Sequence, residues 1–370
     1  LDTDGSRSQR QERSYVGRHA SFLSGIAMVF AFCAESEHED SDGSTSESAS
    51  VDSDGEVAKV MPLPGPVDEL RQVLRERLCL PGDSNYDAAR GDPKDNPEVH
   101  WDKSKGRFRQ TWNFDNIGSP SAIATVENTA EVQAVVKYVG DYCLAAGVLL
   151  CVASGRHSHQ CMLDNTLVLD LQRLNHVSVD TSQQTATVGG GAQQGELDMA
   201  CEPYGLATVA GHNATTGCGG LVLQGGHGFL ERKYGMVVDN LLAAEVVLAD
   251  GRLVMATATE HADLLWALKG GGGNFGVVTS FTFQLHPVSE LWAGQRIHVP
   301  LGLGPFKGRK DLIMSFIDKT IGGRDEATGL MVLPSGGPVI EMDLWVGDAM
   351  EGKEYFKSKN IGFPLRDTSG

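Results

Sequence analysis

The sequence lacks several patterns that would assign its class directly. It has seven cysteines but no CxxC pair, so their spacing gives neither a zinc ribbon nor a disulfide framework. It contains no GxxxxGK[ST] phosphate-binding loop. Basic residues are also scarce, because 31 Lys and Arg stand against 48 Asp and Glu. The resulting net charge of −17 argues against a nucleic-acid partner.

A long hydrophobic run is missing as well. The apolar stretch Phe22–Ala34 is too short to span a membrane comfortably, so no membrane span is predicted. Because arginines precede it, it fits a signal-peptide core and favours the secretory pathway or an extracellular location; a chance apolar patch fits equally. The stretch Glu35–Glu56 holds nine acidic and no basic residues and is expected to be disordered. Residues 1–66 are therefore interpreted as a possible signal segment and an acidic linker.

The remaining chain is organised around a glycine-rich stretch, Ala210–Gly228. Its sequence, AGHNATTGCGGLVLQGGHG, surrounds the apolar triplet Leu221–Leu223. Glycine at this density indicates backbone that adopts unusual dihedrals or lies close against a flat partner. A flexible linker is the alternative, but linkers lack such a triplet and flanking core segments. We name this stretch the glycine wall and expect a planar or phosphate-bearing ligand against it.

A polar turn upstream is the second candidate ligand contact. Asn128 opens a capping-box pattern, and the helix that follows is expected to end at Gly147. Residues 148–153 and 166–171 read as apolar strands, the first buried on both faces. Between them lies Ser154–Ser158, a turn whose backbone amides suit a diphosphate.

A second glycine cluster, Gly271–Gly276, matches the GxGxxG pattern but not its context. A dinucleotide-binding fingerprint needs a strand before it and a helix after it. Here a helix is predicted at residues 261–269, capped from Thr257, and a strand at residues 275–285. Asp250-Gly251 predicts a hairpin just upstream. A nicotinamide cofactor is therefore not expected at this motif.

Taken in order, these pieces resemble the FAD-linked oxidases of the berberine bridge enzyme-like group, in the vanillyl-alcohol oxidase superfamily. The resemblance covers about residues 80–288. Its matching stretches are LPGDSNY at 80–86, ASGRHS at 153–158, LVLD at 167–170, GCGGL at 217–221, GGHG at 225–228, RKYG at 232–235, Asp239-Asn240 and DLLWALKGGGGNFGVVT at 263–279.

The resemblance implies an α+β fold. Residues 67–288 would form a two-lobed PCMH-type FAD-binding domain, and residues 289–370 would begin an antiparallel-sheet substrate domain, with strands near 292–300 and 339–346. Members of the family run on past the point where this chain stops. Because the chain also begins with Leu1 and not Met, it is interpreted as a fragment, expected by itself to bind FAD poorly and to be inactive.

Site residues follow from the resemblance position by position. His157 would bond covalently to the flavin methyl at carbon 8. Arg156 stands where the family usually has glycine, which is unfavourable if the position needs a positive φ, although a phosphate could pair with it. The residues expected to hold the pyrophosphate are Ser154, Gly155, Arg156 and Ser158; those expected to line the nucleotide and flavin are Gly211, Thr216, Gly217, Gly219, Gly220, Gly225 and Gly228, with Val278 at the adenine half.

Three further positions depart from the family. Asn213 occupies the place of a cysteine that forms a second flavin bond in some members, so that bond is not expected, and nearby Cys218 is interpreted as a small buried residue. His159 stands where an active-site tyrosine is common and is the candidate general base, with a partly exposed loop histidine as the alternative. His212 and His227 have no evident partners.

The function predicted from these residues is FAD-dependent transfer of a hydride from a small alcohol, sugar or amine to flavin, with reoxidation by O2. A degenerate flavin-fold protein that binds without catalysis is the main alternative. A metal site is another, because His157, His159 and Cys161 alternate and would share one face of an extended strand. Asn213-Ala-Thr215 also matches a glycosylation sequon, interpreted as chance because a glycan would block the glycine wall.

Overall fold

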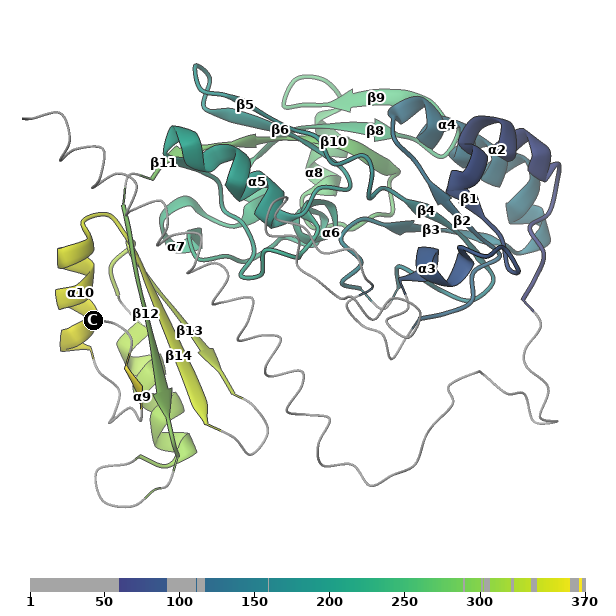
Figure 1. The fold of residues 1–370 in the computed structure, drawn as a ribbon. Helices are drawn as coiled ribbons and strands as arrows, with labels where there is room; N and C mark the ends of the chain where they lie inside the picture. The colour runs from purple at the N-terminus through teal and green to yellow at the C-terminus, as the bar shows by residue number, and fades with distance from the viewer. Residues whose placement is uncertain are drawn as a thin grey trace, which may run out of the picture.

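The computed structural model describes residues 60–91, 111, 117–158, 160–288, 290–300, 302, 307–320, 323–333, 338–359 and 366–367. The predicted signal segment and the acidic stretch 35–56 lie outside these ranges. Within them, strands form four sheets, and helices pack beside the three larger ones, which confirms the α+β class (Figure 1). Each described helix is too short or too polar to cross a lipid bilayer.

The first lobe is a four-stranded sheet in the order β1-β2-β4-β3. Strands β2, β4 and β3 run parallel, and β1 joins the edge in the antiparallel sense. Helices α2 and α4 bury their apolar stripes against it. The bounds are α2 Val67–Leu74, β1 Leu78–Cys79, α3 Tyr86–Arg90, β2 Ala122–Thr125, α4 Thr129–Tyr138, β3 Leu149–Ala153 and β4 Thr166–Asp170.

Capping decides where α4 begins. The side chain of Asn128 accepts a hydrogen bond from the Glu131 amide at 3.0 Å, so the predicted N-cap is confirmed. Irregular helical turns continue to Ala146, and Gly147 closes them at φ 79°. The expectation for β3 was wrong. Among the described residues it is the edge strand of its sheet, and Leu149 and Val152 are 60% and 41% exposed.

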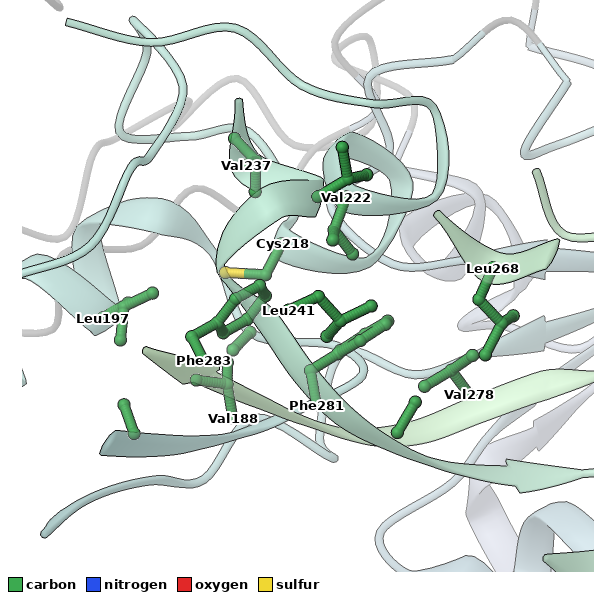
Figure 2. Close-up of a cluster of buried hydrophobic side chains, with 14 of the residues drawn as sticks. Val188, Leu197, Cys218, Val222, Val237, Leu241, Leu268, Val278, Phe281 and Phe283 are labelled. Atoms are coloured by element: carbon green, nitrogen blue, oxygen red, sulfur yellow. The ribbon is translucent and has the colours of Figure 1, made fainter. Parts of the chain in front are cut away.

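The second lobe is a five-stranded antiparallel sheet in the order β5-β6-β10-β8-β9. Its core lies between this sheet and the glycine wall, where Phe281 and Phe283 pack with Cys218 and Val222 (Figure 2). The bounds are β5 Val177–Asp180, β6 Thr185–Gly189, α5 Gln194–Cys201, β7 Leu206–Ala207, α6 Cys218–Leu223, α7 Glu231–Tyr234, β8 Leu241–Val247, β9 Leu253–Ala256, α8 Ala262–Leu268, β10 Val277–Gln284 and β11 His286–Pro287.

The Gly271–Gly276 motif has the context that the sequence predicted. Helix α8 precedes it and strand β10 follows it, which is the reverse of a dinucleotide fingerprint. The hairpin at Asp250-Gly251 joins β8 to β9 as expected. The predicted cap of α8 is wrong: Thr257 accepts from the amides of Thr259 and Glu260 in a turn of its own. The N-cap is instead His261, at φ 49° and without a side-chain bond.

The third large sheet has the antiparallel order β13-β14-β12-β15, with α9 and α10 packed beside it (Figure 1). The predicted strands at 292–300 and 339–346 correspond to β12 and β14. A buried charge cluster lies on the helix-covered face, where Lys319 of α9 donates to Glu341 and Asp343 of β14. The bounds are β12 Leu291–His298, α9 Arg309–Thr320, β13 Ala327–Val332, β14 Val339–Val346, α10 Ala349–Ser358 and β15 Arg366–Asp367.

Candidate functional site

The turn after β3 lies directly against the glycine wall. A Cβ placed on Gly155 would come within 2.1 Å of the Gly217 nitrogen, and a Cβ on Gly217 within 2.3 Å of the Gly155 nitrogen. No side chain fits at either position, so the two segments meet backbone to backbone. The Ser154 hydroxyl adds a bond to the Gly190 carbonyl at 2.7 Å. The predicted turn and the predicted wall therefore form one surface.

Several other predicted residues join this surface. A Cβ on Gly219 would lie 3.3 Å from the Ser154 hydroxyl, and one on Gly155 would lie 3.1 Å from the Thr216 carbonyl carbon. Gly220 differs from these, because it is exposed and a Cβ there would meet nothing within 4 Å. Protein packing therefore does not explain the glycine at 220, whereas approach of a flat ligand would.

Other glycines of the predicted wall pack against residues of the wall itself and not against the turn. Gly228 lies against the Ala210 carbonyl, which a Cβ would approach to 1.6 Å. Gly211 lies beside Leu221, and Gly225 takes a left-handed φ of 102°. The wall is also partly helical, since α6 occupies Cys218–Leu223, a short helix that sequence reasoning did not anticipate.

Val278 is placed differently from the wall residues. Its side chain is buried in the core of the second lobe, near Leu268 and Phe281 (Figure 2). Its carbonyl oxygen is the atom that a Cβ on Gly190 would strike, at 2.2 Å. Contact of Val278 with the adenine half of a nucleotide stays a prediction. Cys218 is also buried in this core, and burial raises the pKa of its thiol, in agreement with a packing role.

Arg156 has the strained backbone that the sequence suggested. Its φ is 57°, in the left-handed region, which costs a non-glycine residue about 1 kcal/mol. The guanidinium is buried and donates to the Asp170 carboxylate at the end of β4. The arginine therefore has an anionic partner inside the lobe. Its contact with a phosphate stays a prediction.

His157 follows in the turn and contacts the wall through its ring. Its Nε2 lies 3.0 Å from the Thr215 hydroxyl, which in turn donates to the Asn213 amide oxygen at 2.8 Å. Burial lowers the pKa of His157 to about 4, against an opposing hydrogen bond to the Thr215 backbone. The imidazole is therefore neutral at pH 7. In the sequence, Thr215 is marked only by the sequon, because its contact with His157 depends on the loop conformation.

The remaining candidate residues of the turn are less constrained. Ser158 is exposed, and its hydroxyl accepts from the Gln160 amide at 3.1 Å. His159, the candidate general base, lies outside the described residues. Cys161 is buried, which raises the pKa of its thiol to about 11. Among the residues that the structure does describe, no group of three His, Cys, Asp or Glu side chains is arranged to hold a metal ion.

Two histidines, one near each end of the wall sequence, have partners that the sequence did not reveal. His227 Nδ1 lies 2.8 Å from the Glu231 carboxylate, one helical turn further along. The ring of His212 packs edge-on against Phe229, with centroids 4.6 Å apart. Burial lowers the pKa of His212. The two contacts thus place both histidine rings beside residues 229–231, next to or within α7.

An arginine of α7 joins the second lobe to the third sheet. Arg232 donates to the Thr320 carbonyl at 2.8 Å and to the Gly323 carbonyl at 2.7 Å. Thr320 is the last residue of α9, so its carbonyl has no partner within the helix. The bond holds the α9 end of the third sheet against the loop that continues from the glycine wall.

Comparisons with known proteins agree with this geometry. The FAD binding domain family matches residues 120–257, which include the turn and the wall. An FAD-linked oxidoreductase of Dictyostelium discoideum is 30% identical over 269 residues, 70% of this chain and 56% of the relative. The (R)-6-hydroxynicotine oxidase of Paenarthrobacter nicotinovorans is 37% identical, over 47% of this chain and 38% of the relative. The glucooligosaccharide oxidase of Sarocladium strictum is 36% identical, over 52% and 38%.

Solved structures give the same result. The 6-hydroxy-D-nicotine oxidase of Arthrobacter nicotinovorans aligns with a TM-score of 0.63 and 27% identity, covering 79% of this chain and 62% of that one. The berberine bridge enzyme-like protein 1 of Physcomitrella patens aligns with a TM-score of 0.66 and 26% identity, covering 81% and 61%. The chain thus spans between 38% and 62% of the length of the five proteins named.

Proposed function

We propose that this chain, which belongs to the FAD-linked oxidoreductases and carries their berberine bridge enzyme-like FAD-binding domain, acts in FAD-dependent oxidation of a small organic substrate. The observation that carries the proposal is the backbone contact between Gly155 and Gly217. It joins a polar turn, whose amides suit a diphosphate, to a glycine wall that includes the open position Gly220. A flat, diphosphate-bearing cofactor matches both halves of this surface.

The residues present fit FAD in chemical character. Ser154, Gly155 and Ser158 would hold the diphosphate, whereas the guanidinium of Arg156 already pairs with Asp170 and would support the turn. His157 is neutral and adjoins the wall, as a histidine that bonds to the flavin must. When bound, FAD supplies the two-electron redox chemistry, and the protein supplies orientation and electrostatics.

The substrate class follows from the relatives. The relatives include an oxidase of a hydroxynicotine and an oxidase of glucooligosaccharides. We infer that the substrate here is an alcohol, a sugar or an amine, that it transfers a hydride to the flavin, and that O2 reoxidises the reduced flavin. His159 is the proposed base for the substrate proton, and His212, which belongs to the glycine wall itself, is a second candidate histidine.

The experiment that tests the proposal is an absorption spectrum of the full-length protein before and after acid precipitation. A flavin spectrum with a yellow pellet supports covalent FAD, and loss of that colour in His157→Ala assigns the bond. A yellow supernatant over a white pellet supports FAD without the bond. A folded, colourless protein would overturn the proposal.

A second measurement separates an oxidoreductase from a protein that only binds flavin. Alcohols, sugars and amines are mixed anaerobically with the yellow protein. Bleaching by any of them, followed by recovery of the colour with O2, supports the oxidase. Flavin that no substrate class bleaches supports the non-catalytic alternative. The bond of Arg156 to Asp170 motivates this alternative, because it engages the guanidinium within the protein and not with a phosphate.

A further inference from the structure

His227 and Glu231 form a bonded pair at the end of the glycine wall. Nδ1 of His227 lies 2.8 Å from the Glu231 carboxylate, and the Gly228 amide donates to the same oxygen at 3.3 Å. An ionised carboxylate can only accept, so the proton of the neutral ring is on Nδ1 and the lone pair is on Nε2. In the same arrangement, a carboxylate orients the histidine that serves as general base in many enzymes.

The backbone that carries His227 is closely packed, although its side chain is not. A Cβ on Gly226 would come within 2.6 Å of the Val237 side chain. One on Gly228 would come within 1.6 Å of the Ala210 carbonyl oxygen. The side chain of His227, between these two glycines, is nevertheless 69% exposed. The ring is therefore held on a constrained backbone and is accessible to a ligand.

The pair also lies where the wall meets the third sheet. Helix α7, which begins at Glu231, lies between α6 of the wall and this sheet (Figure 1). Arg232, the next residue, donates to the carbonyls of Thr320 and Gly323 at the end of α9. Sites for small molecules occur preferentially at such boundaries between structural units. A substrate that enters at this boundary, beside a cofactor on the wall, would meet the exposed ring of His227.

The other ionisable groups around the pair leave Glu231 as its source of charge. His212 interacts electrostatically with both Glu231 and His227, and its ring packs against Phe229. Burial lowers the pKa of His212, so this second ring is neutral at pH 7. Arg232 is the adjacent cation, and its guanidinium is engaged with α9. An imidazolium formed on His227 would thus be stabilised by the carboxylate to which it is already bonded.

We propose that His227 accepts the substrate proton and that Glu231 is the positioning residue that holds its ring as the Nδ1–H tautomer. The inference rests on the proposed function, because it requires bound FAD and a substrate. The proposed function gives this proton to His159, which lies outside the described residues. His227, in contrast, has an observed carboxylate partner and a defined tautomer.

The proton step balances with the components of the proposed function. The O–H or N–H bond of the substrate breaks, its electron pair stays on the oxygen or nitrogen, and the proton passes to Nε2. The adjacent C–H bond gives its hydrogen with both electrons, as hydride, to the flavin. O2 then takes the two electrons of the hydride together with two protons, one from the hydride hydrogen and one from Nε2, and leaves as H2O2.

The first test needs no turnover. Full-length protein is labelled with nitrogen-15 histidine, and the NMR signals of its imidazole nitrogens are recorded at pH 8. The signals that disappear in His227→Gln are assigned to His227. We expect them to show the Nδ1–H tautomer, with Nε2 carrying the lone pair. The flavin content of each variant is recorded as a measure of correct folding.

The second test is the pH dependence of anaerobic flavin bleaching. The probes are cellotriose, 6-hydroxynicotine and benzyl alcohol, and the one that bleaches the wild type fastest is used throughout. We expect the rate to fall toward acid pH, because an imidazolium cannot accept a proton. His227→Gln should abolish this acid limb and slow bleaching at pH 8 about a hundredfold. His159→Gln is the matched control and should keep the limb.

Glu231→Gln separates positioning from packing. It keeps an oxygen that can accept from Nδ1 but removes the charge that stabilises the imidazolium. The acid limb should therefore move to lower pH, by about half a unit at low salt and by less at high salt. A purely structural role of Glu231 would change the rate or the flavin content without this salt-dependent shift.

Several results would overturn the inference. An Nε2–H tautomer of His227 in the wild type would contradict the proposed orientation. An acid limb that is lost in His159→Gln and kept in His227→Gln would assign the proton to His159. A limb at the same pH in Glu231→Gln and the wild type at low salt would remove the positioning role. A yellow wild-type protein that none of the probes bleaches would instead refute the proposed oxidation, and this inference with it.

Discussion

Arg156 and Asp170 form a buried ion pair between the Ser154–Ser158 turn and the end of β4. The guanidinium Nη2 lies 2.8 Å from the carboxylate, and only 4% and 3% of the two side chains are exposed. Asp170 also accepts from the Thr125 hydroxyl, on the neighbouring strand. The pair therefore joins a strained turn to the ends of two strands and offsets the cost of a left-handed arginine.

Removing the arginine is expected to destabilise the protein strongly. Arg156→Ala leaves Asp170 as an unpaired buried charge, which costs about 3–5 kcal/mol in similar cases. Arg156→Gly should lose about 1 kcal/mol less, because glycine adopts the φ of 57° without strain. Urea unfolding of the two variants and the wild type measures the difference.

The charge on Asp170 is tested by a second change. Adding Asp170→Asn to Arg156→Gly removes the unpaired carboxylate, so the double variant should recover part of the lost stability. A double variant less stable than Arg156→Gly alone would contradict the assignment of the loss to the buried charge.

The two hydrogen bonds that Arg232 of α7 donates to the end of α9 and to Gly323 give a further prediction. Arg232→Gln removes the charge and at least one of the bonds to Thr320 and Gly323, each worth about 1.5–3 kcal/mol when fully formed. We expect faster hydrogen exchange in α9 and earlier proteolytic cleavage beside it, while the amides of β10 keep their protection. Arg232→Lys is the control that keeps the charge but not the two-pronged geometry. Unchanged exchange in α9 would show that the third sheet is held by other contacts.

The sequence predicted most elements whose signals are local. The side chain of Asn128 determines where α4 begins, and the turn at Asp250-Gly251 joins two strands a few residues apart. The turn and the wall were also predicted correctly, because each is a short motif that can be recognised within a few consecutive residues. The exposure of β3 could not be predicted, because an apolar run does not show whether both neighbouring strands are present.

Long-range contacts limited the prediction of the site. Asp170, the partner of Arg156, lies 14 residues further along, at the end of β4. From the sequence, a phosphate was as reasonable a partner for Arg156 as this carboxylate. Thr215 meets His157 across 58 residues. Glu341 and Asp343 alternate with apolar residues, a pattern typical of a strand with one solvated face, yet α9 covers that face and supplies Lys319.

The buried cluster around Lys319 is expected to be sensitive to loss of its cation. Lys319→Met keeps the length of the side chain but leaves Glu341 and Asp343 with Arg296 as the nearby cation that the structure describes. Breaking a buried pair in this way costs about 3–5 kcal/mol. Burial, and then the charge of Glu341, raises the pKa of Asp343 to about 6, so Asp343 should take up a proton in the variant before Glu341 does. A thermal midpoint equal to that of the wild type would contradict this.

The depressed pKa of His157 predicts a pH dependence of stability. Burial lowers this pKa from 6.5 to about 4, so between these values the unfolded chain binds a proton that the folded protein does not. Stability contributed by the neutral ring is therefore complete above pH 6.5 and is lost as pH falls toward 4. His157→Gln should show a shallower fall in this window and the same slope as the wild type between pH 7 and 8. Chemical unfolding at half-unit pH steps checks this, and parallel curves across the window would refute it.

Two glycines of the wall allow the effect of protein packing to be separated from the effect of ligand contact, because Gly217 is closely packed and Gly220 is open. Gly217→Ala places a Cβ 2.3 Å from the Gly155 nitrogen, so either the turn or the wall must move. Gly220→Ala meets no protein atom within 4 Å and lies within α6, where alanine is favoured over glycine by about 1 kcal/mol. We expect Gly217→Ala to lower both the thermal midpoint and the flavin content.

Gly220→Ala should keep or raise the midpoint and yet bind less flavin, because the added methyl group occupies the surface where the cofactor would lie. Absorbance at the flavin band and a thermal melt of the same samples separate the two effects. Full flavin content in Gly220→Ala would place the cofactor away from this part of the wall, and the open glycine would then need another explanation.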